Sequence, residues 1–389
     1  MAVKLARAEV IAAYPITPQT PLTEKLSEMI DRGELDAEYV AVESEHSALA
    51  VCIGAASAGV RPFTATSANG LLYMSEQVHW AAGARLPLVM CVVNRGVGAP
   101  WTVWNDHQDA ISQRDAGWIQ LFVKDHQEIM DTTLKAFRLA EEVSIPVMVC
   151  YDGYYLSHTY MPFDAPEQER VDRFLPPFHY AHTLDPSHPE NLNSVTMPDT
   201  RTDVHGETAP SYMDIRHNLH REMVQAIDRL EAIDAAFREL FGRGGHPLME
   251  PWRCDDAEFV IVAMGTLANQ FRDVVERLRE QDGIRAGVLA IHLYRPFPND
   301  RVQAALAGVR GVLVYEKALS YGNQGPLYGD VRSALYDCEP RPAVENFIVG
   351  LGGAGIRTGE LYRTARQACL EIGRQETPDD APHWVGLGV

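Results

Sequence analysis

Two carboxylates, Glu43 and Glu45, stand where the segment "VAVES" passes into the small-residue segment "EHSALAV". Acidic residues in the first turn of a helix complement its dipole, and Ser44 can cap that helix, so a structural role explains both residues. A carboxyl group in a mostly apolar interface has another chemistry, because burial raises its pKa and lets it share a proton with a ligand nitrogen. The residues alone favour the structural role and leave proton sharing as the alternative.

Arg95 offers a second chemistry, because it directly follows the apolar run "LPLVMCVVN". A guanidinium in such a place can bind a carboxylate through paired hydrogen bonds. Gly96 and Gly98 remove side-chain bulk beside it, while Trp101 and Trp104 add aromatic surface. A substrate-binding arginine and an ordinary loop arginine fit this pattern equally well.

A proline-rich loop, "YPITPQTPLTEKL", follows the first apolar run of the chain. Pro15, Pro18 and Pro21 each lack an N–H and fix φ, so none can lie inside a strand or a helix. The residue before each proline is also restricted to extended geometry. The pattern predicts a stiff loop that holds Thr17 in place, which suits a ligand site and equally suits a plain turn.

The segment "NDHQD" contains residue types that ligate metal ions, namely Asp106, His107 and Asp109. The start of a helix explains the same residues. We therefore predict no metal site in this chain.

The segment "VGLGGAG" matches the spacing GxGxxG at Gly350, Gly352 and Gly355, directly after a predicted strand. That spacing hints at dinucleotide binding, but only 34 residues follow it, and no second strand brings an acidic residue to a ribose. We interpret it as a strand-to-helix turn, with a nicotinamide or flavin dehydrogenase as the alternative function.

These candidate residues stand at the ends of short apolar runs that alternate with helical patterns. The run at 86–94 is fully apolar in its centre, as in a buried parallel strand. Such alternation predicts an α/β fold with a mostly parallel sheet covered by helices. Strands are expected over 9–16, 37–44, 61–67, 86–94, 118–124 and 145–153, and helices over 19–33, 45–59, 71–84 and 127–143.

Composition and pattern divide the chain into four segments. A first domain is expected over residues 1–159, and a second α/β domain over 257–375, with strands near 258–266, 285–294, 311–317 and 346–353. Residues 160–256 are first rich in proline, histidine and charge and then helical, which predicts an extended crossover and a helical linker. Residues 376–389 are expected to form a tail.

The composition excludes several classes of protein. The formal charge of −19, from 34 basic and 53 acidic residues, argues against a nucleic-acid or membrane partner. No uncharged apolar run reaches the roughly 18 residues that span a bilayer. The six cysteines form no CxxC pair, so zinc ribbons and cysteine-bound iron–sulfur clusters are not expected here. Buried free thiols in a reducing cytoplasm are the simpler prediction.

Five segments in a fixed order carry a likeness to a known family: "YPITPQT", "VESEHSAL", "TATSANGL", "NRGVGAPWTVWNDHQD" and "RDAGWIQ". Together they resemble the α subunit of the 2-oxoacid:acceptor oxidoreductases, the pyruvate:ferredoxin oxidoreductase family. The segments "VAMGT", "YRPFP" and "NFIVGLGG" extend the resemblance over nearly the whole chain. It implies a domain at 1–159 that binds the pyrimidine ring of thiamine diphosphate, with helices on both faces of its parallel sheet, and a transketolase-C-terminal-like α/β domain at 257–375.

The resemblance also implies a role for each candidate residue. Glu45 is the glutamate that faces the pyrimidine ring and shares a proton with it, whereas Glu43 does not match that position. Thr17 and Arg95 match the residues that hold the substrate carboxylate, and Pro15 packs against the cofactor. The substrate pocket is expected to include Asn69, Gly96, Gly98 and Trp101.

Half of the catalytic machinery of this family is missing from the chain. There is no GDG…N motif for diphosphate and magnesium, since "YDGYY" lacks the leading glycine, and there are no cluster-binding cysteines. The family places those parts on β and δ subunits, beside a γ subunit, so the resemblance implies a hetero-oligomer that is inactive without its partners. CoA is the implied co-substrate, and ferredoxin or an NAD-reducing subunit is the implied electron acceptor.

The implied reaction is the oxidative decarboxylation of a 2-oxoacid to acyl-CoA, CO2 and low-potential electrons. The segment "NRGVG" departs from the family pattern, which has side chains where Gly96 and Gly98 stand. The freed space favours a bulkier 2-oxoacid such as phenylglyoxylate, whereas pyruvate is the common family substrate. A non-catalytic assembly subunit is the alternative, although the complete set of Thr17, Glu45 and Arg95 argues against it.

Overall fold

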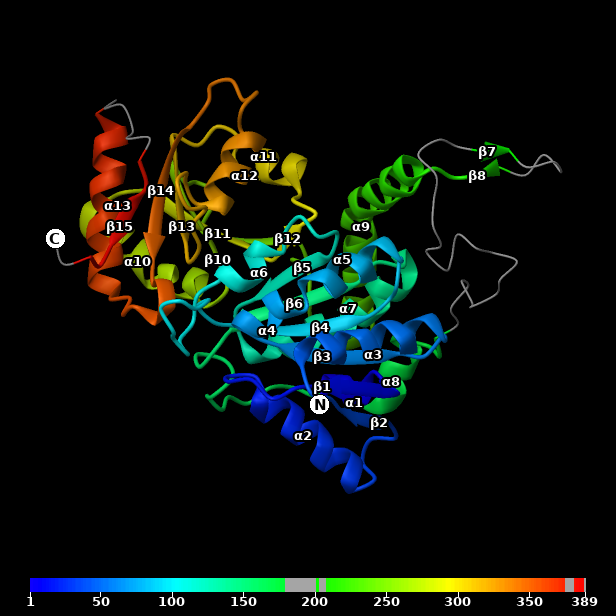
Figure 1. Ribbon diagram of the computed structural model, residues 1–389. Coiled ribbons are helices and arrows are strands. Elements are labelled where there is room, and N and C mark those ends of the chain that lie inside the picture. The colour runs from blue at the N-terminus through cyan, green and yellow to red at the C-terminus, as the bar shows by residue number, and fades with distance from the viewer. Residues whose placement is uncertain (179–200, 203–207, 375–380, 388–389) are drawn as a thin grey trace.

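Two sheets of different size organise the computed structural model, which describes residues 1–178, 201–202, 208–374 and 381–387 (Figure 1). The larger sheet has seven strands and the smaller has six. A short antiparallel ribbon of β7 (Arg201–Thr202) and β8 (Thr208–Ala209) lies apart from both sheets. Parts of the crossover predicted within 160–256 and of the tail predicted over 376–389 lie outside the described residues.

The larger sheet contains all six strands predicted for the first domain. Its strands are β1 (Val10–Ala13), β2 (Glu38–Ala41), β3 (Pro62–Thr66), β4 (Val89–Asn94), β5 (Ile119–Val123), β6 (Val147–Asp152) and β12 (Leu293–Arg295). Their order is β12-β5-β6-β4-β3-β1-β2, and every neighbouring pair is parallel except β12 with β5. The strands β4 and β6 are buried along their whole length, as their unbroken apolar runs predict.

Helices cover both faces of this sheet, so the predicted fold class is confirmed for the first unit. They are α1 (Ala2–Leu5), α2 (Thr20–Asp31), α3 (Glu45–Ser57), α4 (Ala68–Tyr73), α5 (Ser75–Gly83), α6 (Gln108–Ser112), α7 (His126–Val143), α8 (Gln168–Phe174) and α9 (Tyr212–Phe241). One face packs against α1, α2 and α7 to α9, and the other packs against α3 to α6. Within the described residues, none of the helices is both long enough and apolar enough to cross a membrane.

The smaller sheet forms the second α/β unit. Its strands are β9 (Met249–Trp252), β10 (Phe259–Met264), β11 (Ala286–Ile291), β13 (Gly311–Glu316), β14 (Ala343–Val349) and β15 (His383–Val385). Their order is β15-β14-β13-β10-β11-β9, with only β9 antiparallel to its neighbour. The helices of this unit are α10 (Thr266–Asp282), α11 (Asn299–Leu306), α12 (Pro326–Ala334) and α13 (Thr358–Gly373), and a single 3-10 turn, η2 (Leu351–Gly353), follows β14.

One hydrophobic core joins the two units. Met90 of β4 and Met148 of β6 belong to the same buried cluster as Val260 of β10 and Leu289 of β11. Neighbouring residues of β4, such as Val89, point to the opposite face, as the two-residue repeat of a strand requires. Because apolar contact links the sheets, the loops at the edge of one are held in a fixed place against the other.

Three short strands lie across the predicted domain boundaries. β9 falls in the segment predicted as a linker, yet it pairs with β11, and β15 falls in the predicted tail, yet it pairs with β14. β12 belongs by sequence to the second domain but extends the sheet of the first. The boundaries predicted at 256 and 376 therefore cut two strands from the sheet to which they belong. Strands of three or four residues carry too short a pattern to reveal their partners.

Glu316 is a fully buried carboxylate at the end of β13. It accepts hydrogen bonds from the main-chain N–H groups of Leu327 and Tyr328, at 2.9 and 3.0 Å, and from Asn346 Nδ2 at 3.0 Å. Gly325 leaves room for it, because a Cβ there would lie 1.8 Å from Glu316 Oε1. The N-terminus of α12, a kind of place that binds anions in α/β proteins, is thus filled by the chain's own carboxyl group.

This carboxylate makes stability depend on pH. Burial raises the pKa of Glu316 from 4.5 to about 8, so between these values the folded chain keeps a proton that the unfolded chain has lost. Its contribution to stability is therefore complete below about pH 4.5 and is lost as the pH rises through about 8. The Glu316→Gln variant lacks this loss. We therefore expect the melting temperature of the variant, relative to that of the wild type, to be higher at about pH 8.5 than at about pH 5. Thermal melts at both pH values measure the difference, and an equal difference at both would contradict the prediction.

Candidate functional site

The predicted site residues lie at the carboxyl ends of parallel strands, at one edge of the larger sheet. Thr17 follows β1, Glu45 follows β2, Asn69 follows β3, and Arg95 comes directly after β4. The strand order β4-β3-β1-β2 makes these loops neighbours in space. In open α/β sheets this edge is where ligands bind.

Glu45 is the first residue of α3 and is only 8% exposed. Ser44 caps the helix, with its hydroxyl accepting the Ser47 N–H at 3.2 Å, so Glu45 is not needed as a cap. Glu43 is exposed and accepts a hydrogen bond from the Ser47 hydroxyl, which lowers the pKa of Glu43. The Glu45 carboxylate has no hydrogen-bond partner among the residues that the structure describes. The two carboxylates therefore differ: Glu43 supports the start of the helix, and Glu45 is free to meet a ligand.

Gly70 and Thr66 border the Glu45 carboxylate. A Cβ on Gly70 would lie 2.7 Å from Glu45 Oε1 and 2.7 Å from Thr66 Oγ1, so the close approach requires glycine. The Thr66 hydroxyl is buried and has no partner within the described ranges. Buried polar groups need hydrogen-bond partners. The Glu45 carboxylate keeps some exposed surface and can find such a partner in a ring nitrogen of a ligand. These residues thus fit the pyrimidine ring that the family resemblance implies.

Arg95 is 6% exposed and holds two loops together. Its Nε donates to the carbonyl oxygen of Thr102 at 2.7 Å, and its Nη1 donates to the carbonyl oxygen of Thr17 at 2.7 Å. Burial lowers the pKa of Arg95, although an arginine stays charged at neutral pH. Nη2 makes no hydrogen bond to the described part of the chain. This nitrogen is the donor that remains for an anionic ligand.

The proline-rich loop meets Arg95 through its backbone rather than through a side chain. Thr17 offers its carbonyl oxygen to Arg95, while its own hydroxyl has no partner among the described residues. Pro15 and Thr17 are both exposed, so both can contact a bound molecule. Asn69, also exposed, accepts the Gly98 N–H on Oδ1 at 3.0 Å, which ties the loop after β3 to the loop after β4.

The two glycines predicted to enlarge the pocket have different surroundings. A Cβ on Gly96 would lie 2.6 Å from Thr102 Cγ2, so the protein itself already fills the space beside this residue. Gly98 has only ordinary contacts beyond 3.5 Å, and nearby Trp101 is 77% exposed, with its ring 5.6 Å from the Arg95 guanidinium carbon. The idea that Gly96 makes room for a larger substrate is therefore wrong, because the glycine serves loop packing.

The "GLGGAG" loop packs against the segment that follows Arg95. The Gly352 N–H donates to Asp106 Oδ2 at 2.9 Å, and a Cβ on Gly353 would lie 2.2 Å from Trp104 Cβ. The loop connects β14 to α13 through η2, which confirms the predicted strand-to-helix turn. Its tight contact with a neighbouring loop explains the glycines without a nucleotide.

The three residues of "NDHQD" whose types ligate metal ions, namely Asp106, His107 and Asp109, are all bonded to protein groups. Asp106 accepts from Gly352, and His107 Nε2 lies 2.7 Å from Asp152 Oδ1. Asp109 is fully buried and accepts the Arg95 main-chain N–H at 3.0 Å, and burial raises the pKa of Asp109 to about 7. The segment leads into α6, which begins at Gln108, so the predicted helix start is confirmed.

A buried polar cluster behind this segment links the two units. Asp152, at the end of β6, accepts the Thr266 N–H at 2.7 Å and lies 3.4 Å from Lys317 Nζ. Lys317 also donates to Asn105 Oδ1 at 3.0 Å. Burial opposes the charge on Asp152, but Lys317 and His107 outweigh it and hold the pKa of Asp152 well below its usual range. The ion pair between Asp152 and Lys317 therefore connects the two units behind the Arg95 loop.

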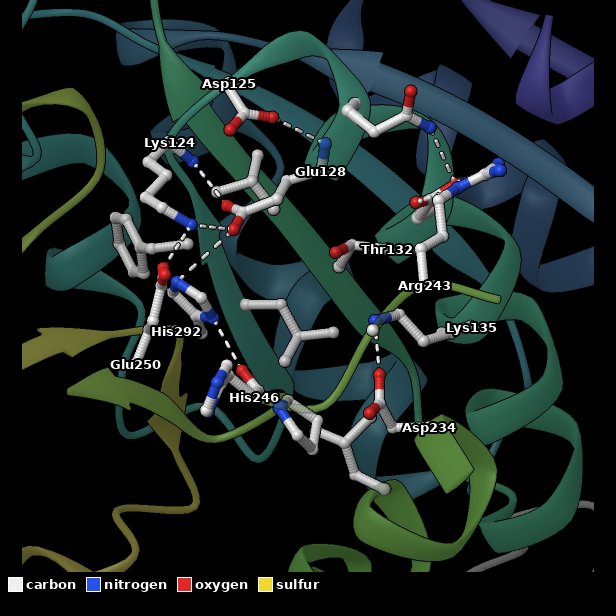
Figure 2. Close-up of a pocket in the computed structure, with 18 residues that line it drawn as sticks. Lys124, Asp125, Glu128, Thr132, Lys135, Asp234, Arg243, His246, Glu250 and His292 are labelled. Atoms are coloured by element: carbon white, nitrogen blue, oxygen red, sulfur yellow. Dashed lines mark hydrogen bonds and ion pairs between the residues drawn. The ribbon is translucent and has the colours of Figure 1, made fainter. Parts of the chain in front are cut away.

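A cavity of about 250 Å³ opens elsewhere, between β5, α7 and the segment that leads to β9 (Figure 2). Its charged side chains pair with one another: Lys135 with Asp234 at 2.8 Å, and Arg243 with Asp131 at 2.7 Å. Glu128, Glu250 and His292 have the mutual spacing of metal ligands. The ammonium of Lys124, however, contacts both Glu128 and Glu250, so a cation of the protein itself already balances these carboxylates.

Sequence reasoning missed several residues that shape the site. Gly70 and Thr66 both lie in the segment "TATSANGL", whose threonines and glycine had no assigned role. Asp152 and Lys317 carried a signal, because each is a charged residue at or just after the end of a fully apolar strand. Charges in that position often serve a buried network or a site.

The comparisons with known sequences agree with one another over most of the chain. A family profile described as "Pyruvate flavodoxin/ferredoxin oxidoreductase, thiamine diP-bdg" matches residues 1–224, and "Pyruvate:ferredoxin oxidoreductase core domain II" matches residues 257–361. Pyruvate synthase subunit PorA of Methanothermobacter thermautotrophicus is 42% identical over 388 residues, which cover 99% of this chain and 95% of that protein. Ketoisovalerate oxidoreductase subunit VorA of Pyrococcus abyssi is 43% identical over 365 residues, covering 94% and 89%.

Solved structures support the fold. A 2-oxoglutarate:ferredoxin oxidoreductase from Magnetococcus marinus superposes with a TM-score of 0.65 at 20% identity, over 95% of this chain and 63% of that one. A split-gene transketolase superposes with a TM-score of 0.52 at 13% identity, over 95% and 96%. With relatives above 40% identity along nearly its full length, this chain belongs to the pyruvate:ferredoxin oxidoreductase family of 2-oxoacid oxidoreductases, as an α subunit with a thiamine-diphosphate-binding domain.

Proposed function

We propose that this chain is the α subunit of a hetero-oligomeric enzyme that oxidises a 2-oxoacid in the presence of CoA. The reaction converts the 2-oxoacid anion and CoA into acyl-CoA, CO2, two electrons and one proton. The observation that carries this proposal is the buried Glu45 carboxylate, which lies without a described partner beside Gly70 and the Thr66 hydroxyl. Bound thiamine diphosphate would supply the electron-sink chemistry by which a 2-oxoacid loses CO2.

Glu45 has the role of a proton partner for a ring nitrogen of the cofactor. Its burial keeps water from competing for the carboxylate, and the absence of a described protein partner leaves both oxygen atoms available. Pro15 offers an exposed apolar ring on the loop after β1. These residues bind and orient the ring, and Glu45 holds or gives up the proton.

Arg95 and Thr17 have the role of binding the substrate carboxylate. The two protein hydrogen bonds of Arg95 fix its guanidinium plane, so Nη2 is held in place for a carboxylate oxygen. The Thr17 hydroxyl and the Asn69 amide are exposed on the neighbouring loops. Pre-oriented donors lower the entropy cost of substrate binding.

Partner subunits complete the enzyme. We assign diphosphate and magnesium binding to a β-type subunit and the iron–sulfur clusters to a δ-type subunit, beside a γ-type subunit. The support is that this chain has neither a GDG…N motif nor CxxC pairs. Ferredoxin or an NAD-reducing subunit takes the electrons. The 42% identical relative PorA is named as a subunit, which marks that protein as one component of a larger assembly.

A small or branched 2-oxoacid is the favoured substrate. The relatives above 40% identity are named for pyruvate and for ketoisovalerate. An aryl substrate such as phenylglyoxylate would need space beside Gly96 or Gly98. A Cβ on Gly96 would clash with Thr102, whereas one on Gly98 would make only ordinary contacts with Asn69 and Trp101. Trp101 is exposed beside Arg95 and is the side chain that an aryl group would meet.

The native complex, purified without oxygen through a tag on this chain, tests the proposed function. CoA-dependent reduction of a viologen dye is measured with pyruvate, branched-chain 2-oxoacids, 2-oxoglutarate and phenylglyoxylate. We expect strong reduction with pyruvate or a branched-chain 2-oxoacid. A complex that contains thiamine diphosphate and iron but reduces no dye with any of them would contradict the proposal.

Two other functions have specific observations against them. A dehydrogenase that uses the "GLGGAG" loop would need its main-chain N–H groups for a diphosphate, but the Gly352 N–H already donates to Asp106. Titration of the chain with NADH should therefore leave the nicotinamide fluorescence unchanged. A pure assembly subunit would have no use for a buried carboxylate without a partner. The activity of site variants distinguishes an assembly subunit from a catalytic one.

The Gly70→Ala variant is expected to lower turnover by about 10²-fold, because a displacement near 1 Å at a reacting group has an effect of that size. The new methyl group would collide with the Glu45 carboxylate and with Thr66, both 2.7 Å from its carbon. Dye reduction by the purified complex measures the effect. Gly54→Ala is the matched control, since Gly54 lies in α3 with no atom within 4 Å of a Cβ. Equal activities of the two variants would contradict the role of Gly70.

A further inference from the structure

Asp109 accepts hydrogen bonds from two loops of the site, while its own side chain is fully buried. Each carboxylate oxygen accepts two hydrogen bonds. Oδ2 accepts the main-chain N–H groups of Ala68 and Arg95, at 2.9 and 3.0 Å. Oδ1 accepts Asn94 Nδ2 and the N–H of Ala110, both at 2.8 Å. A buried carboxylate with this many donors is fully used by the protein.

The two donors to Oδ2 belong to different walls of the site. Arg95 follows β4, and Ala68 begins α4, one residue before Asn69. Ala68 has a φ of 45°, a left-handed conformation that costs energy for a residue with a Cβ and needs a compensating contact. The hydrogen bond to Asp109 supplies that contact. One carboxylate oxygen thus joins the Arg95 backbone to the turn that carries Asn69.

We propose that Asp109 is a positioning residue for substrate binding. It holds the Arg95 backbone and the turn at residues 67–69 at the distance that substrate binding requires. The inference rests on the proposed function, because it concerns the binding of the 2-oxoacid carboxylate by Arg95. Asp109 itself does not touch the substrate. It acts through the main chain of the two loops that do.

Asparagine cannot replace this carboxylate. An amide has one oxygen atom, whereas Ala68, Arg95, Asn94 and Ala110 present N–H donors to both oxygens of Asp109. In either amide orientation, an NH2 group would face two donors and push them apart. The Arg95 and Ala68 backbones would separate, or the Asn94 side chain would turn away. Its neighbour Asp106 cannot compensate, since its oxygens accept the N–H groups of Gln108 and Gly352.

The test uses Asp109→Asn in the complete complex, with KM for the 2-oxoacid, kcat and melting temperature measured together. We expect KM to rise by about tenfold, the size of losing about one charge-assisted hydrogen bond, while kcat changes by less than KM. Asp131→Asn is the matched control, because Asp131 is also buried and accepts from Arg243 at 2.7 and 2.9 Å, far from the loops of the site. The control is expected to lower the melting temperature and leave KM unchanged.

A second variant keeps the proposal testable if Asp109→Asn does not fold. Asn94→Ala removes one donor to Asp109 without adding a clash, and we expect a rise in KM of about two- to fivefold in the same direction. If Asn94→Ala and any folded Asp109→Asn keep KM within twofold of the wild type and lose only stability, as Asp131→Asn does, Asp109 is merely structural and the proposal is overturned. A wild-type complex that turns over no 2-oxoacid would overturn the proposed function first, and this inference with it.

Discussion

Turnover is expected to fall by about 10²- to 10⁴-fold when Glu45 is replaced by glutamine in the assembled complex, the range that positioned proton transfer contributes. Glutamine keeps the shape of the side chain and can still make a hydrogen bond, but it cannot share a proton. Glu45 is buried beside Gly70 and Thr66, and no other carboxylate of the described residues borders the Cβ position of Gly70. The measurement is dye reduction at saturating substrate, together with the subunit composition and the thiamine diphosphate content of the complex.

The neighbouring carboxylate provides the control for this experiment. Glu43 is exposed and bonds only to the Ser47 hydroxyl, so Glu43→Gln should keep normal turnover. Loss of activity in the Glu45 variant must come with intact assembly, because a complex that falls apart says nothing about proton transfer. An assembled Glu45→Gln complex with wild-type turnover would eliminate Glu45 as the proton partner.

Replacement of Arg95 by lysine is expected to raise KM for the 2-oxoacid by about 10- to 150-fold, which corresponds to about 1.5–3 kcal/mol for a hydrogen bond to a charged group. Nε and Nη1 of Arg95 bind the carbonyl oxygens of Thr102 and Thr17, and only the remaining donors can reach a carboxylate. A lysine has one nitrogen and cannot serve two carbonyls and a substrate in one plane. We expect kcat to change less than KM, since the ammonium keeps the charge.

Arg114→Lys is the control for the arginine. Arg114 lies in the same stretch of chain, and its nearest acidic partner is Asp115, 3.7 Å away. Its replacement should leave KM unchanged. If Arg95→Lys also has a KM within twofold of the wild type for every 2-oxoacid tested, Arg95 does not bind the substrate carboxylate.

The pattern of apolar runs was enough to predict the central strands and their parallel pairing. β4 and β6 are continuous apolar segments, and their burial on both faces follows directly from that composition. Hydrophobic periodicity is a local property, so it can be read from the chain. It could not reveal β9 or β15, whose three or four residues carry little pattern of their own. It also could not show that the strand predicted over 285–294 divides into β11 and β12, which belong to different sheets.

The candidate site, like the fold, could be predicted from the sequence only in part. Glu45 and Arg95 could be selected from the sequence, because each follows a predicted strand and belongs to a segment that resembles the family. The sequence could not tell Glu45 from Glu43 by chemistry alone, since both are acidic residues at a helix start. Their difference is burial, 8% exposure for Glu45 against an exposed Glu43, and burial depends on what packs around them.

By itself, then, the sequence determined the family and the α/β architecture, and it made Glu45 and Arg95 the candidates for the chemistry. Only the tertiary structure decided that Gly70 makes room for Glu45, that Gly96 serves loop packing, and that Asp109 joins two walls of the site. The physical reason is that hydrogen bonds and close contacts form between atoms brought together by folding. Gly96 illustrates this, because its crowding comes partly from Gly352, which is 3.3 Å from its Cβ position and lies in the other unit.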